Sequence, residues 1–247
     1  MKNVPTLLRR ELGAYFASVM GYVVIMFFLL VMGIFFALVV SFLSRQPTQL
    51  TAMKLVFSMF WLPGLVVVPA ITMRLLAEEK RMGTIEMLMT APVTHFEVVF
   101  AKWLGAVALY ALMWAVTGLY IVILRQFAGN PQALDIGPIL AGYVGVLVIG
   151  QFLISIGVLA SALTKNQVAA ALMSFTLIFL MTLVVYWVSS LFPGGKWGDF
   201  FQFLSPFKHM DDFSRGIVDV RPLVLYLSGS ALMLFITTRL VQLRKWR

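Results

Sequence analysis

The sequence predicts an all-α membrane protein with six transmembrane helices. Of its 247 residues, 61% are hydrophobic and only 12% are charged, whereas about 25% of the residues in an ordinary globular chain are charged. Six apolar runs could each cross about 30 Å of hydrocarbon at about 1.5 Å per residue, and none contains Asp, Glu, Lys, Arg or His. The runs cover residues 19–43, 55–73, 103–124, 136–163, 168–192 and 222–238.

The segment before the first run, residues 1–18, has the pattern of an amphipathic helix. Apolar side chains recur at helical spacing from Leu7 to Val19, and Arg9 and Arg10 fall on the opposite side. Such a helix would lie in the membrane interface, although an ordinary basic flank is the alternative. The first run is too long for a cleaved signal peptide, and no A-x-A-like cleavage site follows it.

The second run contains Pro63, Gly64 and Pro69. Proline removes a backbone donor and bends a helix, so this span is expected to be kinked. In a membrane a kink persists where neighbouring groups satisfy the freed carbonyls. The kink could therefore line a path or an interface, or be purely structural.

A charged segment, residues 77–97, separates the second and third runs and begins AEEKRMGTIEMLMTAPVT. Gly83 allows a backbone turn, and Thr84 is a plausible N-cap for a short helix that carries Glu86 in its first turn. The sequence thus predicts a helix parallel to the membrane, with a solvated turn as the alternative. After Pro92, Thr94-x-x-Glu97 has the spacing of a capping box that would start the third span.

Two other connections have recognisable signals. Asn166 is a predicted N-cap between the fourth and fifth runs, and Gly129-Asn130-Pro131 predicts a turn. In residues 193–221, aromatic and charged side chains alternate, Ser205-Pro206 resembles a helix start and Gly216 a helix stop. Two short amphipathic helices at the outer interface fit this segment better than an open loop.

The distribution of Lys and Arg predicts the orientation. With both termini in the cytoplasm, twelve of the 19 Lys and Arg residues would face the cytoplasm, as the positive-inside rule requires. The 77–97 segment and Lys165 would share that side, and 193–221 would face outward.

Several function classes are disfavoured. The net charge of +9 fits basic flanks facing anionic lipid better than nucleic-acid binding. The chain has no cysteine and no G-x-x-x-x-G-K-[ST] loop, so thiolate chemistry and ATP binding through its own P-loop are excluded. With no ionisable side chain in the runs, a proton relay or an intramembrane enzyme is not expected. Neither a catalytic residue nor a metal site is predicted.

The charged segment carries a family resemblance. Residues 77–94, followed by Ala101-Lys102-Trp103-Leu104-Gly105, resemble the E-x-x-x-G-T-x-E-x-L-x-x-x-P-[VI]-[ST] … K-x-L-[GA] signature of ABC-2 type permeases, the membrane subunits of one class of ATP-binding-cassette exporters. Arg9-Arg10-Glu11-Leu12 and residues 204–216 also resemble the family. The short chain is similar to the small permeases of the gliding-motility-associated and nitrous-oxide-reductase-maturation types.

The resemblance implies roles for individual segments. Residues 1–18 would form an elbow helix that includes Arg9, Arg10 and Glu11. Residues 84–91 would form a coupling helix that docks on the ATPase, and residues 193–217 would form outer re-entrant helices. Methionine stands at two positions of the coupling helix where the family often has leucine. The residues implied in ATPase coupling are Glu78, Glu79, Gly83, Thr84, Glu86, Met87, Leu88 and Pro92.

The resemblance also implies the assembly. The partners would be an ABC ATPase subunit, which binds ATP and Mg²⁺, and a second permease copy or a sister permease, in a bacterial inner membrane. An accessory periplasmic or membrane protein is a further partner to consider, while this chain itself would hold no cofactor. The alternative function is a non-transporting membrane anchor or assembly subunit that uses the same charged segment.

Overall fold

The computed structural model describes residues 3–45, 51–83, 93–127, 135–192 and 195–243. Within these ranges the chain forms helices and no strands. Six helical segments are long and apolar enough to cross a membrane, which confirms the predicted all-α membrane fold. The six are Val19–Arg45, Trp61–Met82, His95–Gln126, Ile136–Leu163, Gln167–Leu191 and Val220–Leu243.

The first segment is the predicted amphipathic helix, α1 (Val4–Phe16). It lies across the lower end of the bundle before the chain turns into α2 (Val19–Arg45). Arg9 and Arg10 are exposed, as expected, but the residue that α1 buries is Glu11. The amphipathic pattern therefore predicted the helix and missed its most buried side chain.

Helix α9 (Ile136–Leu163) is the centre of the bundle, because 78% of its most apolar window is buried, against 28% in α2. Small residues allow its neighbours to approach. A Cβ placed on Gly150 would lie 2.2 Å from the Tyr110 ring, and one on Gly157 would lie 2.3 Å from Thr72 Oγ1. Both contacts are too close for any side chain, so glycine is required where these neighbours cross α9.

The second apolar run, residues 55–73, is interrupted, as its prolines predicted. It is divided between α3 (Ala52–Ser58) and α4 (Trp61–Thr72), with the break at Met59 and Phe60, so the second membrane-crossing segment begins only at Trp61. Pro63 explains the position, because its nitrogen has no hydrogen to donate to the carbonyl of Met59, four residues earlier, and proline costs least in the first turn of a new helix. Pro69 lies inside α4, which continues through it.

The third and fifth spans are also interrupted. The third consists of α7 (His95–Val116) and α8 (Leu119–Phe127). The fifth consists of α10 (Gln167–Phe179), a π-helical turn (Leu180–Val184) and α11 (Val185–Leu191). Asn166 caps α10 as predicted, with its Oδ1 accepting from Val168 N at 2.9 Å.

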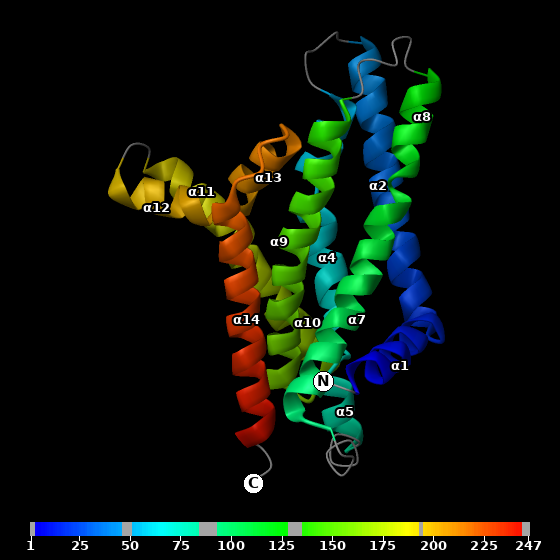
Figure 1. The fold of residues 1–247 in the computed structure, drawn as a ribbon, viewed down its shortest axis with the longest axis vertical. Coiled ribbons are helices and arrows are strands. Elements are labelled where there is room, and N and C mark those ends of the chain that lie inside the picture. Colours follow the sequence, from blue (N-terminus) through cyan, green and yellow to red (C-terminus); the bar gives the residue numbers. More distant parts are fainter. Residues whose placement is uncertain (1–2, 46–50, 84–92, 128–134, 193–194, 244–247) are drawn as a thin grey trace.

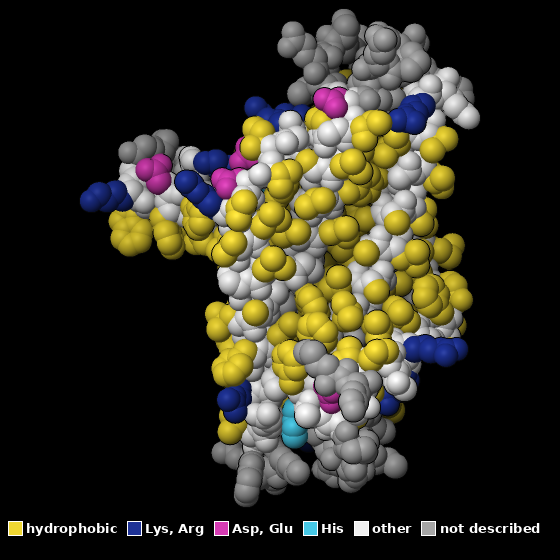
Figure 2. Space-filling model, in the orientation of Figure 1, with side chains coloured by type: hydrophobic (Ala, Val, Ile, Leu, Met, Phe, Trp, Pro, Cys, Tyr) yellow, Lys and Arg dark blue, Asp and Glu magenta, His cyan; other side chains and the backbone are white. Residues whose placement is uncertain are grey.

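Two short helices, α12 (Lys196–Leu204) and α13 (Pro206–Ser214), precede α14 (Val220–Leu243). Gly216 has a φ of 86° and stops α13, as predicted. Helices α11 and α12 project sideways from the bundle (Figure 1), while α13 packs on α3 and α9. Figure 2 shows hydrophobic atoms along the underside of this projection and charged atoms along its upper side.

The ends of the bundle differ in the helices they hold. Helix α1, α5 (Ala77–Met82) and the C-terminal end of α14 share the lower end in Figure 1, whereas α13 and the end of α8 lie towards the other. A broad hydrophobic surface separates the charged ends (Figure 2), as expected for a protein whose sides face lipid. Which end faces the cytoplasm remains the prediction made from the Lys and Arg count.

Candidate functional site

The candidate site surrounds the short helix α5, which leads directly into the predicted coupling helix, residues 84–91. We refer to residues 84–92 as the coupling segment. Glu78 and Glu79 lie in its first turn and Lys80 and Arg81 in its last, as the helix dipole favours. Gly83 ends the helix with a φ of 72°, a left-handed conformation that glycine adopts without steric cost. The predicted backbone turn at Gly83 is therefore confirmed.

The start of α5 is tied to the end of the central helix α9. Ser161 Oγ accepts from the backbone N–H groups of Leu76 and Ala77, each at 3.0 Å, and donates to Met73 O at 3.2 Å. The Lys80 ammonium donates to the carbonyl of Ala162. These contacts satisfy backbone groups that the turn between α4 and α5 leaves open, so α5 is held directly by the core of the bundle.

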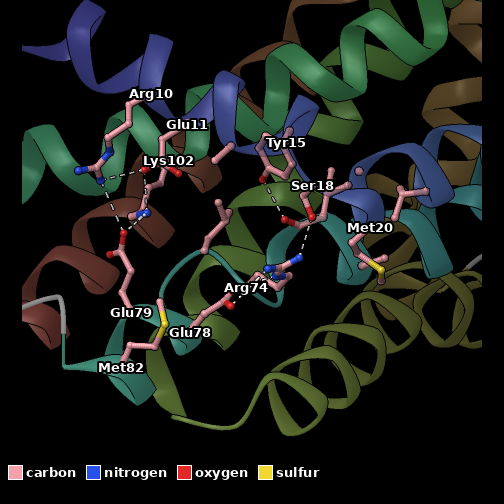
Figure 3. Close-up of a pocket in the computed structure, with 16 residues that line it drawn as sticks. Arg10, Glu11, Tyr15, Ser18, Met20, Arg74, Glu78, Glu79, Met82 and Lys102 are labelled. Carbon is pink, nitrogen blue, oxygen red and sulfur yellow. Dashed lines mark hydrogen bonds and ion pairs between the residues drawn. The ribbon is translucent and has the colours of Figure 1, made fainter.

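On the other side of α5, a buried lysine joins three helices. Lys102 Nζ, on α7, lies 2.9 Å from Glu11 Oε1 of α1 and 2.7 Å from Glu79 Oε1 of α5. Arg10 Nη2 completes the group, at 3.2 Å from Glu11 Oε1 and 3.7 Å from Glu79 Oε1. Figure 3 shows these four side chains converging, and we refer to them as the inner ionic junction.

Burial makes this junction energetically significant. The side chain of Lys102 is 4% exposed and that of Glu79 is 15% exposed. Removing an ion from water costs several kcal/mol, about what a well-placed opposite charge returns. Two cations and two carboxylates balance the charge here, so loss of any one would leave a buried charge uncompensated.

A second polar group lies beside the junction. Arg74 Nε donates to Glu78 Oε2 at 2.7 Å, and Arg74 Nη1 donates to Ser18 Oγ at 3.0 Å. Tyr15 Oη donates to the carbonyl of Ile71 at 2.9 Å. Burial raises the pKa of Tyr15 well above its ordinary value, which keeps the phenol protonated as a donor. A cavity of about 430 Å³ lies between these groups and the inner ionic junction.

The far side of the coupling segment is fixed by the start of α7. Thr94 Oγ1 accepts from Glu97 N at 3.2 Å, and Glu97 Oε2 accepts from Thr94 N at 3.0 Å. This reciprocal pair is the predicted capping box. Because α7 begins at His95, well before the apolar run, it includes Lys102 within its second turn and places it against α1 and α5.

The structure describes some of the predicted coupling residues and leaves others out. Glu78 and Glu79 both form ion pairs within the chain, Glu78 with Arg74 and Glu79 with Lys102 and Arg10. Arg9 is exposed on α1. Their predicted roles at the ATPase remain predictions, as does that of Gly83. The predicted residues outside the described ranges are Thr84, Glu86, Met87, Leu88 and Pro92.

Sequence reasoning missed the residues that hold this site together. It assigned no site role to Arg74 or Ser161 and named Lys102 only as part of the family signature, and none of the apolar runs contains Asp, Glu, Lys, Arg or His. A signal was present in Glu11, the single acid of a basic helix, and in Lys102, a cation next to an apolar run. Pairing the two required knowing that residues 91 positions apart meet.

The opposite end of the bundle has an ionic cluster of its own. Asp211 of α13 lies 3.1 Å from Lys54 Nζ of α3 and 2.7 Å from Arg215 Nη2, and we refer to these three residues as the outer ionic cluster. Burial raises the pKa of Asp211, but hydrogen bonds from Lys54 and Arg215 outweigh burial and leave that pKa below its ordinary value. Among the described residues, no group of three or more His, Cys, Asp or Glu side chains could hold a metal ion.

Comparison with models of known protein families gives a match. Residues 64–241 match the family model described as ABC-2 family transporter protein. The matched residues run from α4 through α14 and include α5, Lys102 and Ser161. Among curated proteins, none matches the chain.

Proposed function

The chain belongs to the ABC-2 family of transporter proteins, and we propose that it is the permease subunit of an ATP-driven exporter. In this proposal it lies in a bacterial inner membrane with both termini in the cytoplasm. Two permeases, either two copies or a copy and a sister chain, would form the translocation path. A separate ATPase subunit would bind ATP and Mg²⁺ and supply the energy.

The observation that carries the proposal is the family match, which contains three of the six membrane-crossing segments whole and most of two others. The six apolar helices agree with a membrane-embedded permease. The family assignment favours a role in transport. The geometry around α5 supports a mechanism in which an ATPase drives transport by moving the 84–92 segment.

Both flanks of the 84–92 segment are anchored to the bundle. On the N-terminal flank, Lys80 and the backbone of Ala77 bind α9, and Glu79 binds Lys102. On the C-terminal flank, the Thr94 capping box leads directly into α7. A displacement of the segment would therefore be passed to α1, α7 and α9 together rather than absorbed by a loose connection.

This connectivity supports a rigid-body mechanism. ATP would bring the two ATPase subunits together, and each would push on the 84–92 segment of its permease. The inner ionic junction would carry α1 along with α5 and α7, and the two six-helix halves would rock about their shared interface. Substrate would pass between the halves or leave sideways into lipid.

We assign different tasks to the predicted coupling residues. Glu86 and Leu88 would contact the ATPase, with Met87, Thr84 and Pro92 shaping that surface. Gly83, Glu78 and Glu79 would position the segment, since the two carboxylates already bind partners within the chain. Docking and positioning residues should therefore fail in different ways when they are replaced.

The experiment compares ATP turnover in membranes that contain the permease and its ATPase. The double variant Glu86→Ala/Leu88→Ala should fold normally but lose most of the permease-dependent turnover, because central residues of an interface often contribute about 2 kcal/mol or more. Arg125→Ala, an exposed change at the other end of the bundle, is the control. Normal turnover in the double variant would contradict the docking role.

The same assay separates transport from anchoring. The purified permease alone should not hydrolyse ATP, because it has no phosphate-binding loop. Adding its ATPase should give turnover that responds to the permease. An ATPase that binds the permease but turns over ATP at the same rate without it would favour a non-transporting anchor instead.

A further inference from the structure

The cavity beside the inner ionic junction has two chemically different parts. Its polar part is lined by Arg74, Ser18 and Glu78, and its apolar part by side chains of α2 and α4. The apolar lining is formed by Met20, Val24, Ala70 and Ile71. A volume of about 430 Å³ is within the range of about 300–1,000 Å³ that is usual for small-molecule sites.

The cavity lies between the ends of the first two predicted apolar runs, the depth at which lipid headgroups would meet hydrocarbon. Ser18 directly precedes the first apolar run and Arg74 directly follows the second, and a 3.0 Å hydrogen bond joins them. The start of the first apolar run and the end of the second therefore lie at the same depth in the bundle. From this depth the apolar lining continues along α2 and α4 towards the middle of the bundle.

Arg74 retains capacity for a further anionic partner. A guanidinium has five N–H donors, and three hydrogen bonds to Glu78 and Ser18 are formed among the described residues. The side chain is 38% exposed and borders the cavity. Ser18 Oγ accepts from Arg74, so its own hydroxyl hydrogen can be donated to a second acceptor. A phosphate oxygen suits both donors.

The charges around the cavity favour a zwitterion over an anion. Three cations, Arg10, Arg74 and Lys102, are balanced by three carboxylates, Glu11, Glu78 and Glu79. In a zwitterionic headgroup the phosphate would face the cations and the ammonium would face the carboxylates. A purely anionic headgroup would gain the guanidinium but would also face the carboxylates.

We propose that this cavity binds one phospholipid of the phosphatidylethanolamine type, with its phosphate on Arg74 and Ser18 and the start of an acyl chain along Met20, Val24, Ala70 and Ile71. The lipid would fill the space between α1 and the ends of α2 and α4. It would act as a structural ligand of the elbow. The proposal needs only the membrane location of the chain and is independent of transport.

The test measures lipid bound to the full-length chain in detergent after delipidation. Dioleoyl phosphatidylethanolamine, dioleoyl phosphatidylglycerol and inorganic phosphate are titrated separately, with native mass spectrometry and the thermal unfolding midpoint as readouts. We expect one phosphatidylethanolamine per chain, a raised unfolding midpoint, weaker binding of phosphatidylglycerol and no shift with inorganic phosphate. An equal shift with inorganic phosphate, or tighter binding of phosphatidylglycerol, would overturn the proposal.

Two variants test the two parts of the cavity separately. Arg74→Gln removes the phosphate partner, and Ala70→Leu fills the apolar part while leaving every charge in place. Each should weaken phosphatidylethanolamine binding by about tenfold or more, whereas Arg125→Gln, a loss of charge at the other end, should not. If Arg74→Gln proves too unstable to purify, Ala70→Leu decides alone. Wild-type affinity in Ala70→Leu would overturn the proposal.

Discussion

The inner ionic junction and the outer ionic cluster use the same chemistry with different consequences. In each, a lysine lies about as close to a carboxylate, with Lys102 at 2.7 Å from Glu79 and Lys54 at 3.1 Å from Asp211. Their surroundings differ, since the side chains of Lys102 and Glu79 are 4% and 15% exposed whereas those of Lys54 and Asp211 are 20% and 44% exposed. Distance alone therefore does not rank these ion pairs, because water and salt screen the outer one.

The two groups also differ in what they connect. The inner ionic junction joins α1, α5 and α7, so it links the helix before the 84–92 segment to the helix after it. The outer ionic cluster joins α3 to α13 through Lys54 and Asp211, and its second ion pair, Asp211 with Arg215, is local, four residues apart. We therefore expect stability and coupling to depend strongly on the inner group and weakly on the outer one.

The largest effect is expected from Lys102→Gln. The change removes the buried partner of Glu11 and Glu79 and leaves them only Arg10, whose side chain is 51% exposed, so the free energy of unfolding should fall by about 3–5 kcal/mol. Chemical unfolding of the chain in detergent measures the loss. Lys54→Gln is the matched control at the outer end, and equal losses in the two variants would break the comparison.

A smaller effect is expected at the two glycines with positive φ, one near each group. Gly83→Ala and Gly216→Ala should each cost about 1–2 kcal/mol of unfolding free energy, because an L side chain is strained in the left-handed region. A Cβ on Gly216 would also lie 3.3 Å from Pro138, whereas no described atom lies within 4 Å of one on Gly83.

The coupling readout should separate these two glycines. Gly83→Ala should also lower the ATP turnover of the assembled complex, since Gly83 leads into the coupling segment, whereas Gly216→Ala should change stability alone. Gly13→Ala, inside α1 and with no described atom within 4 Å of its Cβ, should be neutral or stabilising. Unchanged turnover in Gly83→Ala would contradict its positioning role.

Acidic pH should weaken the outer end through a buried histidine. His209 Nδ1 lies 2.8 Å from Tyr226 Oη, and burial lowers the pKa of His209 below its ordinary value. The unfolded chain then binds more protons than the folded one as the pH falls below about 6.5, so stability present above that pH is progressively lost. Unfolding midpoints at pH 7.5 and 5.5 should differ less in His209→Gln than in the wild type. An equal pH dependence in both would show that other groups cause it.

The smallest effect is expected at Lys54. Lys54→Gln should lower the free energy of unfolding by at most about 1 kcal/mol, because the partner Asp211 is well exposed and keeps Arg215. The loss should shrink further in 1 M salt, where exposed charges are screened over about 3 Å. A loss that is large and independent of salt would show that the outer ionic cluster is as strongly coupled as the inner one.

Local signals in the sequence were reliable. The capping box of Thr94 and Glu97, the N-cap Asn166 and the stop at Gly216 were predicted and are confirmed. Each involves residues within a few positions of one another, where the backbone itself brings the partners together. The six apolar spans were predicted for a related reason, since a lipid environment demands long uncharged runs.

Features that depend on neighbouring helices were not predictable in the same way. The prolines predicted a kink in the second span, but only the structure gives the place of the break, at Met59 and Phe60. Nothing in the sequence indicated the π-helical turn Leu180–Val184. Such irregularities are tolerated where packing partners satisfy or cover the backbone, and those partners come from distant parts of the chain.

The sequence by itself determined the membrane fold, several helix caps and the place of the charged segment, because each follows from hydropathy or from contacts within a few residues. The tertiary structure alone decided that Lys102 meets Glu11 and Glu79, and that Ser18 meets Arg74 beside a cavity. These pairs form because the packing of α1, α4, α5 and α7 brings distant charges out of water at one point. Burial then makes them matter, since the same charges in solvent would be screened.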